Sequence, residues 1–278
     1  MLELSKIDEL RPLARLVSKV SAAAGATAFA IAGAQARDLH LKHANGIDTA
    51  RKTGDVDFAF NVGSWQEFHD LRRSLLASGE FTEFTRDLQR LKFRGTLEID
   101  IVPFGGTENA KRAIEWPPDQ DFVMSAFGFR EAFGSLIEVR LPEEQTVMVV
   151  SLPALALLKL EAWRDRHRRA PGKDAYDLRL IFENYMDVIG QERVYDEFAQ
   201  LLTEDFDYVL AGVHILGHDI RQLLDEQGSE RVNRLLDEQS REAGQLSLVT
   251  EMKLELRDGV KLMTALSDGF RAGVSSAS

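Results

Sequence analysis

The chain has 278 residues, with 34 Lys and Arg against 45 Asp and Glu for a formal net charge of −11, and 44% of its residues are hydrophobic. This composition is that of a globular protein and excludes a fibrous or disordered chain, and the net charge excludes broad attraction to nucleic acid. The absence of Cys excludes disulfides, thiolate zinc sites and cysteine nucleophiles. No apolar run approaches the roughly 20 residues that span a bilayer, and the first residues are acidic, so we expect a cytoplasmic protein with no membrane partner.

The first half of the chain alternates between the patterns of helices and strands. The expected elements, in chain order, are a helix over 6–22, a strand over 26–32, a helix over 35–42, a strand over 55–62, a helix over 65–77, strands over 81–86, 90–95 and 96–102, and two strands near Ile137 and Val147.

From Ser151 onward nearly every segment has the pattern of a helix. The helix after Ser151 has Pro153 in its first turn, where proline is tolerated. Further helices are expected over 173–187, 191–203, 206–226, 229–243 and 248–270. The sequence therefore predicts an α+β fold, with a mixed sheet and flanking helices over residues 1–150 and a helical domain over 151–278.

The segment Asp55-Val56-Asp57-Phe58 is the most informative in the chain. Side chains alternate along a strand, so Asp55 and Asp57 project from one face, about 7 Å apart, while Val56 and Phe58 enter the core. Neighbouring carboxylates repel each other, and a hard cation such as Mg²⁺ or Mn²⁺ relieves that repulsion. The alternative is the solvent face of an ordinary strand, where such pairs are common.

A second strand adds carboxylates to this pattern. In residues 97–101 the apolar side chains face one way, while Glu98 and Asp100 face the other. If the two strands pair with matching faces, Asp55, Asp57 and Asp100 converge on one point. Three carboxylates can hold two divalent ions roughly 3.5–4 Å apart, which activates an attacking hydroxyl and neutralises a leaving pyrophosphate. We therefore predict a metal site of Asp55, Asp57 and Asp100.

Two nearby segments could contact an anion. A short apolar strand turns through Gly33-Ala34 into a helix, which presents free backbone N–H groups and the positive end of the helix dipole. An ordinary strand-to-helix turn is the alternative. Arg90, Lys92 and Arg94 share one face of the strand beside the carboxylates, where they could hold phosphate oxygens or form salt bridges to the acids.

Two features of the second half also have alternative interpretations. Residues 164–173 contain five Lys or Arg, which fits a phosphate contact or a solvated helix end favoured by the helix dipole. His214 and His218 lie four residues apart, so both rings could face one metal ion, although their apolar neighbours favour packed histidines.

Taken in order, these motifs resemble the nucleotidyltransferase superfamily, and within it the AbiEii-type group of toxins, which includes abortive-infection (AbiEii/AbiGii) and MenT-like proteins. The likeness covers roughly residues 25–185. The segments that carry it are Gly33-Ala34, Arg51-x-Thr53-x-Asp55-x-Asp57, Ile99-Asp100-Ile101, Lys159 and Lys173-Asp174-x-x-Asp177-Leu178.

The resemblance implies a nucleotidyltransferase-like mixed sheet and a set of roles for these residues. Asp55 and Asp57 would be metal ligands, and Asp100 would bind metal and help to deprotonate the acceptor. Gly33 and Ala34 would cradle the triphosphate.

The remaining implied roles fall on the segments outside that cluster. Lys159 and Asp174 would be catalytic, and the other nucleotide-binding residues would be Arg51, Thr53, Lys173 and Asp177. The helical domain over 151–278 would thereby contribute to the active-site cleft. Because Lys159 projects from an apolar helix, it would be costly to bury unpaired, so a phosphate or an Asp partner is expected, and a lysine that snorkels to the rim is the alternative.

The resemblance also implies an activity and its partners. The enzyme would move a nucleoside monophosphate from an NTP to an acceptor hydroxyl with Mg²⁺ (or Mn²⁺), as the toxin of a toxin–antitoxin pair acting on tRNA. The alternatives are a small-molecule nucleotidyltransferase and a catalytically silent relative that binds proteins. The net charge of −11 argues against a large nucleic-acid footprint. In the silent relative, the acidic tail over 191–278, with 9 basic and 17 acidic side chains, would bind a basic protein. An antitoxin protein is the further partner that the resemblance implies.

Overall fold

The computed structural model describes residues 1–49, 54–83, 87–240 and 246–273 of the chain. It contains two compact units, Met1–Ser151 and Leu152–Ser278, which we describe separately.

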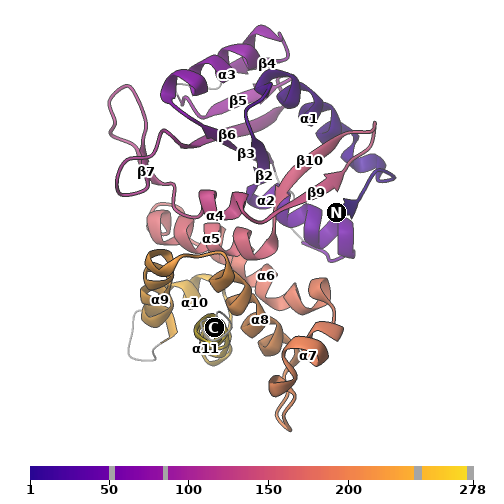
Figure 1. The fold of residues 1–278 in the computed structure, drawn as a ribbon, viewed down its shortest axis with the longest axis vertical. Helices are drawn as coiled ribbons and strands as arrows, with labels where there is room; N and C mark the ends of the chain where they lie inside the picture. The colour runs from indigo at the N-terminus through magenta and orange to yellow at the C-terminus, as the bar shows by residue number, and fades with distance from the viewer. Residues whose placement is uncertain (50–53, 84–86, 241–245, 274–278) are drawn as a thin grey trace. The chain divides into compact units, whose positions relative to one another are not determined.

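A mixed sheet of eight strands forms the centre of the first unit within the described residues (Figure 1). Its strands in spatial order are β1 (Leu2–Glu3), β9 (Leu136–Arg140), β10 (Thr146–Val150), β2 (Phe29–Ala32), β3 (Asp55–Val62), β6 (Leu97–Gly105), β5 (Arg90–Phe93) and β4 (Phe81–Glu83). The pairs β1–β9, β10–β2 and β3–β6 are parallel and the others are antiparallel. The predicted α+β fold with a mixed sheet is confirmed.

Helices and a small second sheet accompany this sheet. They are η1 (Asp8–Leu10), α1 (Arg11–Ala24), α2 (Gly33–Asp38), η2 (Leu39–Ala44), α3 (Trp65–Ala77), β7 (Ala113–Glu115), β8 (Val123–Ser125) and α4 (Phe129–Phe133). The helix α3 begins at an N-cap, where the side chain of Ser64 accepts a hydrogen bond from the backbone N–H of Glu67 at 3.2 Å. Helices α1 and α3 contact each other, and each buries an apolar stripe of the kind that its sequence spacing predicts.

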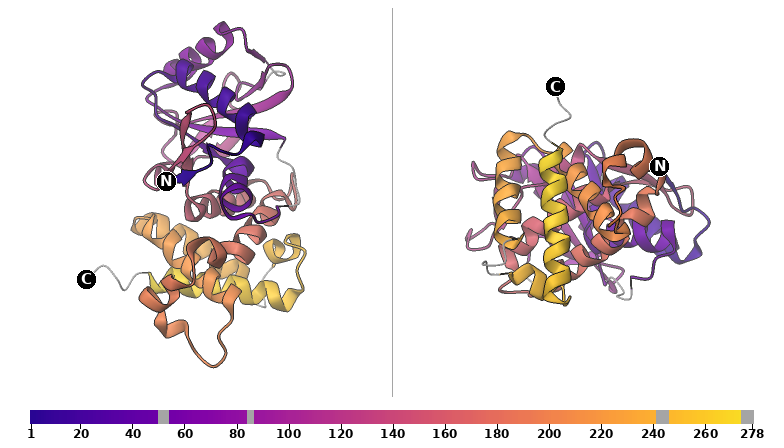
Figure 2. Two further views of the ribbon diagram at one scale, coloured as in Figure 1. Left: turned by 90° about the vertical axis from the view of Figure 1, so that its right-hand side faces the viewer. Right: turned by 90° about the horizontal axis from the view of Figure 1, so that it is seen from below.

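All the regular elements described in the second unit are helices. Its elements are α5 (Leu152–Arg166), α6 (Lys173–Ile189), α7 (Glu192–Glu197), η3 (Ala199–Leu201), α8 (Tyr208–Gln222), α9 (Glu226–Ser240), α10 (Ser247–Glu251) and α11 (Leu256–Ala272). The helix α11 packs against α8 and α9 (Figure 2). A Cβ atom on Gly269 would lie 1.8 Å from the backbone oxygen of His214, so only glycine permits α8 and α11 to approach this closely.

Two of the helices expected in this unit are interrupted. The helix predicted over 191–203 ends at Glu197, because Phe198 leaves the helical conformation (φ −130°, ψ 34°) and its buried ring packs edge-on against His218 at 5.1 Å. The helix predicted over 248–270 is divided into α10 and α11, since Lys253 between them has a left-handed φ of 57°. Both breaks depend on tertiary contacts or turns that helical periodicity does not report.

The strands around β6 also differ from prediction at their ends. β6 extends to Gly105, beyond the predicted end at Val102, because its parallel pairing with β3 continues to the pair Val62 and Gly105. β4 has its described end at Glu83, and the rest of the strand predicted over 81–86 lies outside the described residues.

Within the described residues, no helix combines the length and the apolar character needed to cross a bilayer.

Candidate active site

The predicted carboxylates meet on two neighbouring strands of the sheet. β3 and β6 pair in parallel, with Asp57 directly beside Asp100 and Asp55 beside Glu98. Side chains alternate along each strand, so the buried Val56 and Phe58 face the core while the acids share the opposite face. The strand pairing and the matching faces that the sequence argument requires are therefore present.

Asp55, Asp57 and Asp100 each offer a carboxylate oxygen, and these oxygen atoms lie within 4.8 Å of one another. All three residues are partly exposed, so an ion could reach them from solvent. Carboxylate oxygens are hard ligands, and a set of three fits Mg²⁺ or Mn²⁺. Among the described residues this is the single cluster of acids and histidines with such geometry, and it does not include His214 or His218.

Arg90 binds the third carboxylate. It lies opposite Asp100 in the antiparallel pair of β5 and β6, and its Nε and Nη2 donate hydrogen bonds to Oδ1 and Oδ2 at 2.8 and 3.1 Å. The hydrogen bonds to Asp100 are the largest cause that raises the pKa of the Arg90 guanidinium. A carboxylate has about four lone-pair sites, so Asp100 can hold Arg90 and still ligate an ion. The sequence left two alternatives for this basic face, contact with phosphate oxygens or salt bridges to the acids, and Arg90 forms a salt bridge.

The other basic residues of that strand lie differently. Lys92 stays on β5 opposite Glu98 and is partly exposed. Arg94 lies beyond the end of β5, in a left-handed turn with φ 49°, and forms an ion pair with Glu80. The sequence placed Arg94 on the same face as Arg90, and the turn moves it out of the strand.

Gly33 lies directly against the carboxylate cluster. β2 is antiparallel to β3, and its last residue, Ala32, pairs with Asp57. The chain then turns at Gly33, whose φ is +64°, and α2 begins. A Cβ atom on Gly33 would lie 1.7 Å from Oδ2 of Asp57, so no larger residue fits at this turn. The N–H groups in the first turn of α2, those of Gly33 and Ala34 among them, have no acceptor within the helix.

Lys159, Asp174 and Asp177 come together inside the helical unit. Nζ of Lys159, on α5, lies 3.2 Å from an oxygen of Asp174 and 2.5 Å from an oxygen of Asp177, both on α6. The side chains are 6%, 1% and 1% exposed, so Lys159 is a buried paired lysine and not one that reaches the surface. The expected Asp partner for this lysine is therefore observed. Lys173 is the first residue of α6 and is partly exposed.

The basic stretch over 164–173 supplies a further partner to this cluster. Nε and Nη2 of Arg166 donate to the two oxygens of Asp174 at 2.7 and 2.8 Å. Burial opposes ionisation of Asp174, but the hydrogen bond from Arg166 and the charge of Lys159 outweigh it and hold the pKa of this carboxyl below its ordinary value. Sequence reasoning missed this pair, although the run of bases just before Lys173 was a usable signal.

Glu251 is another residue that the motifs do not indicate. It follows the motif region by more than seventy residues, yet its side chain accepts hydrogen bonds from the indole of Trp163 at 3.1 Å and from the backbone N–H of Gly172 at 2.9 Å. It thereby ties α10 to the end of α5 and the start of α6. Arg51 and Thr53, which the resemblance assigned to nucleotide binding, lie outside the described residues.

Comparison with known proteins gives a family match and, among solved structures, a weak likeness. The family described as nucleotidyl transferase AbiEii toxin, type IV TA system, matches residues 15–257. The solved structure of the antibiotic-resistance factor ANT(2'')-Ia is 19% identical, with a TM-score of 0.38, over 68% of this chain and 90% of its own. No curated protein matches the chain. The family match, which spans most of the chain, thus carries the assignment.

Proposed function

The chain belongs to the nucleotidyl transferase AbiEii toxin family, and from this premise we propose that it transfers a nucleoside monophosphate from an NTP to an acceptor hydroxyl at a Mg²⁺ site formed by Asp55, Asp57 and Asp100. The family establishes the enzyme class. The observation that supports this site is the convergence of the three carboxylates within 4.8 Å on two paired strands.

The proposed chemistry uses the side chains and backbone around these strands. When bound, Mg²⁺ would supply positive charge that polarises the α-phosphate and stabilises the leaving pyrophosphate. Backbone N–H groups at Gly33 and Ala34 would donate to triphosphate oxygens. The acceptor oxygen bonds to the α-phosphorus, the bond from that phosphorus to the bridging oxygen of pyrophosphate breaks, and Asp100 takes the hydroxyl proton. Arg90 orients the Asp100 carboxylate for this role through its two hydrogen bonds.

The buried helical cluster has a separate part in the proposal. The family resemblance assigns Lys159 and Asp174 to catalysis and Asp177 to nucleotide binding, and their mutual pairing supports a positioning role that holds α5 against α6. Lys173, which is partly exposed at the start of α6, is the member of this segment that we propose to contact nucleotide phosphate.

Replacement of one carboxylate tests the site. Asp57→Asn keeps the shape of the side chain and removes its charge, so we expect transfer of label from an α-labelled NTP to fall below detection. The matched control is Glu98→Gln, because Glu98 lies on the same face, two residues from Asp100, outside the cluster. Labelling by Asp57→Asn at the level of Glu98→Gln would refute the proposed site.

A silent relative is separated from an enzyme by ligand binding. An NTP with Mg²⁺ at about 100 times its dissociation constant should add about 2.7 kcal/mol to the free energy of unfolding. A melting temperature that NTP and Mg²⁺ leave unchanged, together with absent labelling, would favour the protein-binding alternative.

We further propose that the chain is the toxin of a toxin–antitoxin pair, on the basis of the family description. The proposal that its acceptor is tRNA is based on the resemblance of the sequence motifs alone. Labelling reactions with total tRNA, and separately with small hydroxyl acceptors, decide between the polymer and the small molecule. Growth arrest on expression of the wild type, relieved by Asp57→Asn, would be the expected result for a toxin.

A further inference from the structure

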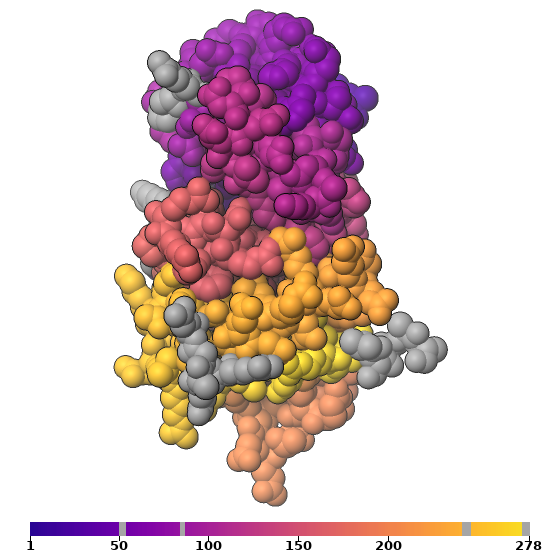
Figure 3. All heavy atoms as spheres, turned by 90° about the vertical axis from the view of Figure 1, so that its left-hand side faces the viewer, coloured from indigo at the N-terminus to yellow at the C-terminus, as the bar shows by residue number. Residues whose placement is uncertain are grey.

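Exposed apolar side chains gather on one surface of the helical unit. Tyr195, Leu202 and Phe206 are 63%, 40% and 39% exposed, and they are three of the seven large apolar residues that are exposed among those described. Single exposed apolar residues are ordinary, but a cluster rimmed by polar groups marks an interaction site. All three lie within twelve residues, on α7 and on the connection from η3 to α8, which forms the orange tip at the lower edge of Figure 3. We call this region the Phe206 surface.

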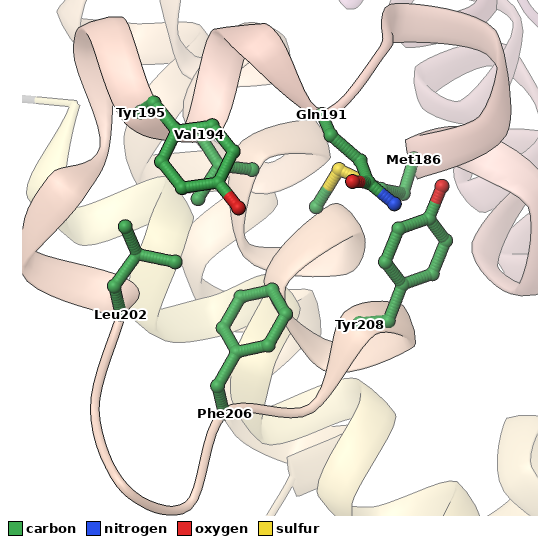
Figure 4. A pocket seen from close by; sticks show the side chains of 7 residues that line it. All are labelled: Met186, Gln191, Val194, Tyr195, Leu202, Phe206 and Tyr208. Atoms are coloured by element: carbon green, nitrogen blue, oxygen red, sulfur yellow. The ribbon is translucent and has the colours of Figure 1, made fainter.

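The Phe206 surface contains two hollows that share the Phe206 ring as a common wall. Figure 4 shows the first, toward which side chains converge from α6, α7, the connection and α8, with Val194 and Tyr208 beside the exposed residues. Leu210 and Ala265 contribute apolar surface to the second, which Asp205, Asp207 and Asp268 also line. The first hollow suits an apolar side chain of a protein segment, and the acidic second hollow suits a neighbouring basic side chain. Aromatic residues such as Phe206 are enriched at the centres of protein interfaces.

The rim of this surface is strongly acidic. Residues 187–207 contain seven carboxylates and one basic residue, Arg193. The guanidinium of Arg193 is already bound, to Asp219 at 2.6 and 2.7 Å and to Glu197 at 3.1 Å. No described Lys or Arg forms an ion pair with Glu204 or Asp205, which directly precede Phe206 in the chain. The rim thus has uncompensated negative charge around an apolar centre.

We propose that the Phe206 surface binds a basic amphipathic segment of a partner protein. Its apolar side chains would enter the first hollow, and its Lys or Arg side chains would meet the acids of the second hollow and of the rim, which gives complementary charge. Nucleic acid does not fit, because its phosphates would face the same carboxylates. A second copy that used this surface symmetrically would oppose like charges.

A designed peptide tests the proposal on the full chain. The probe is a fluorescein-labelled amphipathic peptide of Leu and Lys with helical spacing, and the matched peptide has Glu in place of Lys. We expect the Lys peptide to bind and the Glu peptide not to bind, as measured by fluorescence anisotropy. In the double variant Leu202→Ser/Phe206→Ser the dissociation constant should rise at least tenfold. In the double variant Glu204→Gln/Asp205→Asn, the dissociation constant of the Lys peptide should depend less on salt concentration than in the wild type.

The first unit offers a matched control segment. Asp119 and Asp121 are exposed acids beside Phe122 and Val123, which are exposed at 43% and 45%. The variants Asp119→Asn/Asp121→Asn and Phe122→Ser/Val123→Ser should leave peptide binding within twofold of the wild type. An equal loss in both regions would mean that a cationic peptide binds any acidic surface of the chain, and would overturn the proposal.

A cross-linking experiment locates the binding site of the Lys peptide without relying on its affinity. A benzophenone group on the Lys peptide should cross-link to residues within 195–210, and cross-links elsewhere would overturn the assignment. Self-association in sedimentation that Leu202→Ser/Phe206→Ser abolishes would replace the partner with a second copy. Because these residues lie outside the proposed active site, NTP labelling by the same variants should match the wild type. The labelling result for Asp57→Asn tests the proposed function and does not test peptide binding at the Phe206 surface.

Discussion

Gly33 offers a direct test of whether the turn after β2 shapes the carboxylate cluster. In Gly33→Ala the new Cβ would lie 1.7 Å from Oδ2 of Asp57, whereas ordinary van der Waals contact needs about 3.4 Å. The Asp57 carboxylate must therefore retreat by about 1.7 Å, because the β2–β3 pairing holds the backbone on both sides. That retreat removes one of the three oxygens from the cluster.

The size of the effect follows from this displacement. A misplacement of about 1 Å in an active site can cost about 100-fold in rate, so we expect NTP labelling by Gly33→Ala to fall by at least about 100-fold. The left-handed backbone at Gly33, with φ +64°, adds a cost of about 1–2 kcal/mol in folding stability for any residue with a Cβ atom. Activity should thus fall far more than stability.

A second glycine separates the two contributions. Gly79 has a comparable φ of +73°, and a Cβ atom there would meet nothing within 4 Å. Gly79→Ala should therefore lose about 1–2 kcal/mol of stability and keep its labelling activity. Urea unfolding, the shift in melting temperature with Mg²⁺, and label transfer are measured on both variants. If Gly33→Ala responded to Mg²⁺ and transferred label as Gly79→Ala does, a steric effect of the Gly33 turn on Asp57 would be ruled out.

Three other predictions concern the charged pairs. Arg90→Met should lower the Mg²⁺ concentration for half-maximal thermal stabilisation, because it removes a positive charge beside Asp100 that would repel the ion. The change should be less than about fivefold, since the Arg90 side chain is 34% exposed and its pair with Asp100 contributes at most about 1 kcal/mol. A rise in that concentration would contradict this effect of the Arg90 charge. Lys159→Met should lower the free energy of unfolding in urea by about 3–5 kcal/mol, since it removes a buried positive charge that contacts two buried carboxylates and leaves Asp174 with Arg166 as its cation. The exposed Lys42→Met should change the free energy of unfolding by less than about 1 kcal/mol. Asp174 has a lowered pKa in the folded chain, so its ionisation stabilises the fold above about pH 4. This stability is lost as the pH falls through the lowered pKa. Below about pH 4 the urea midpoint of unfolding should therefore decline less steeply for Asp174→Asn than for the wild type.

The hydrophobic periodicity of the sequence was sufficient to predict the strand β3 of the candidate site and the helix α3 that follows it. Alternation over 55–62 predicted β3 with its observed bounds, and helical spacing predicted α3 over Trp65–Ala77. It also predicted which side chains of β3 and β6 share the acidic face, because side-chain direction in a strand repeats every two residues whatever the strand packs against. The sequence also predicted an anionic partner for Lys159, either a phosphate or an Asp, because a charge buried on an apolar helix must be paired; the structure shows Asp174 and Asp177.

Other features depend on residues far apart in the sequence and were decided only by the tertiary structure. The position of Asp100 beside Asp57 needs the parallel register of β3 with β6, and the contact between Gly33 and Asp57 needs β2 on the other side of β3. The breaks at Phe198 and Lys253, and the hydrogen bonds of Glu251 to α5 and α6, likewise have no local signal. Periodicity records which way a side chain points along its own element, whereas the neighbour that it meets is set by how the elements pack together.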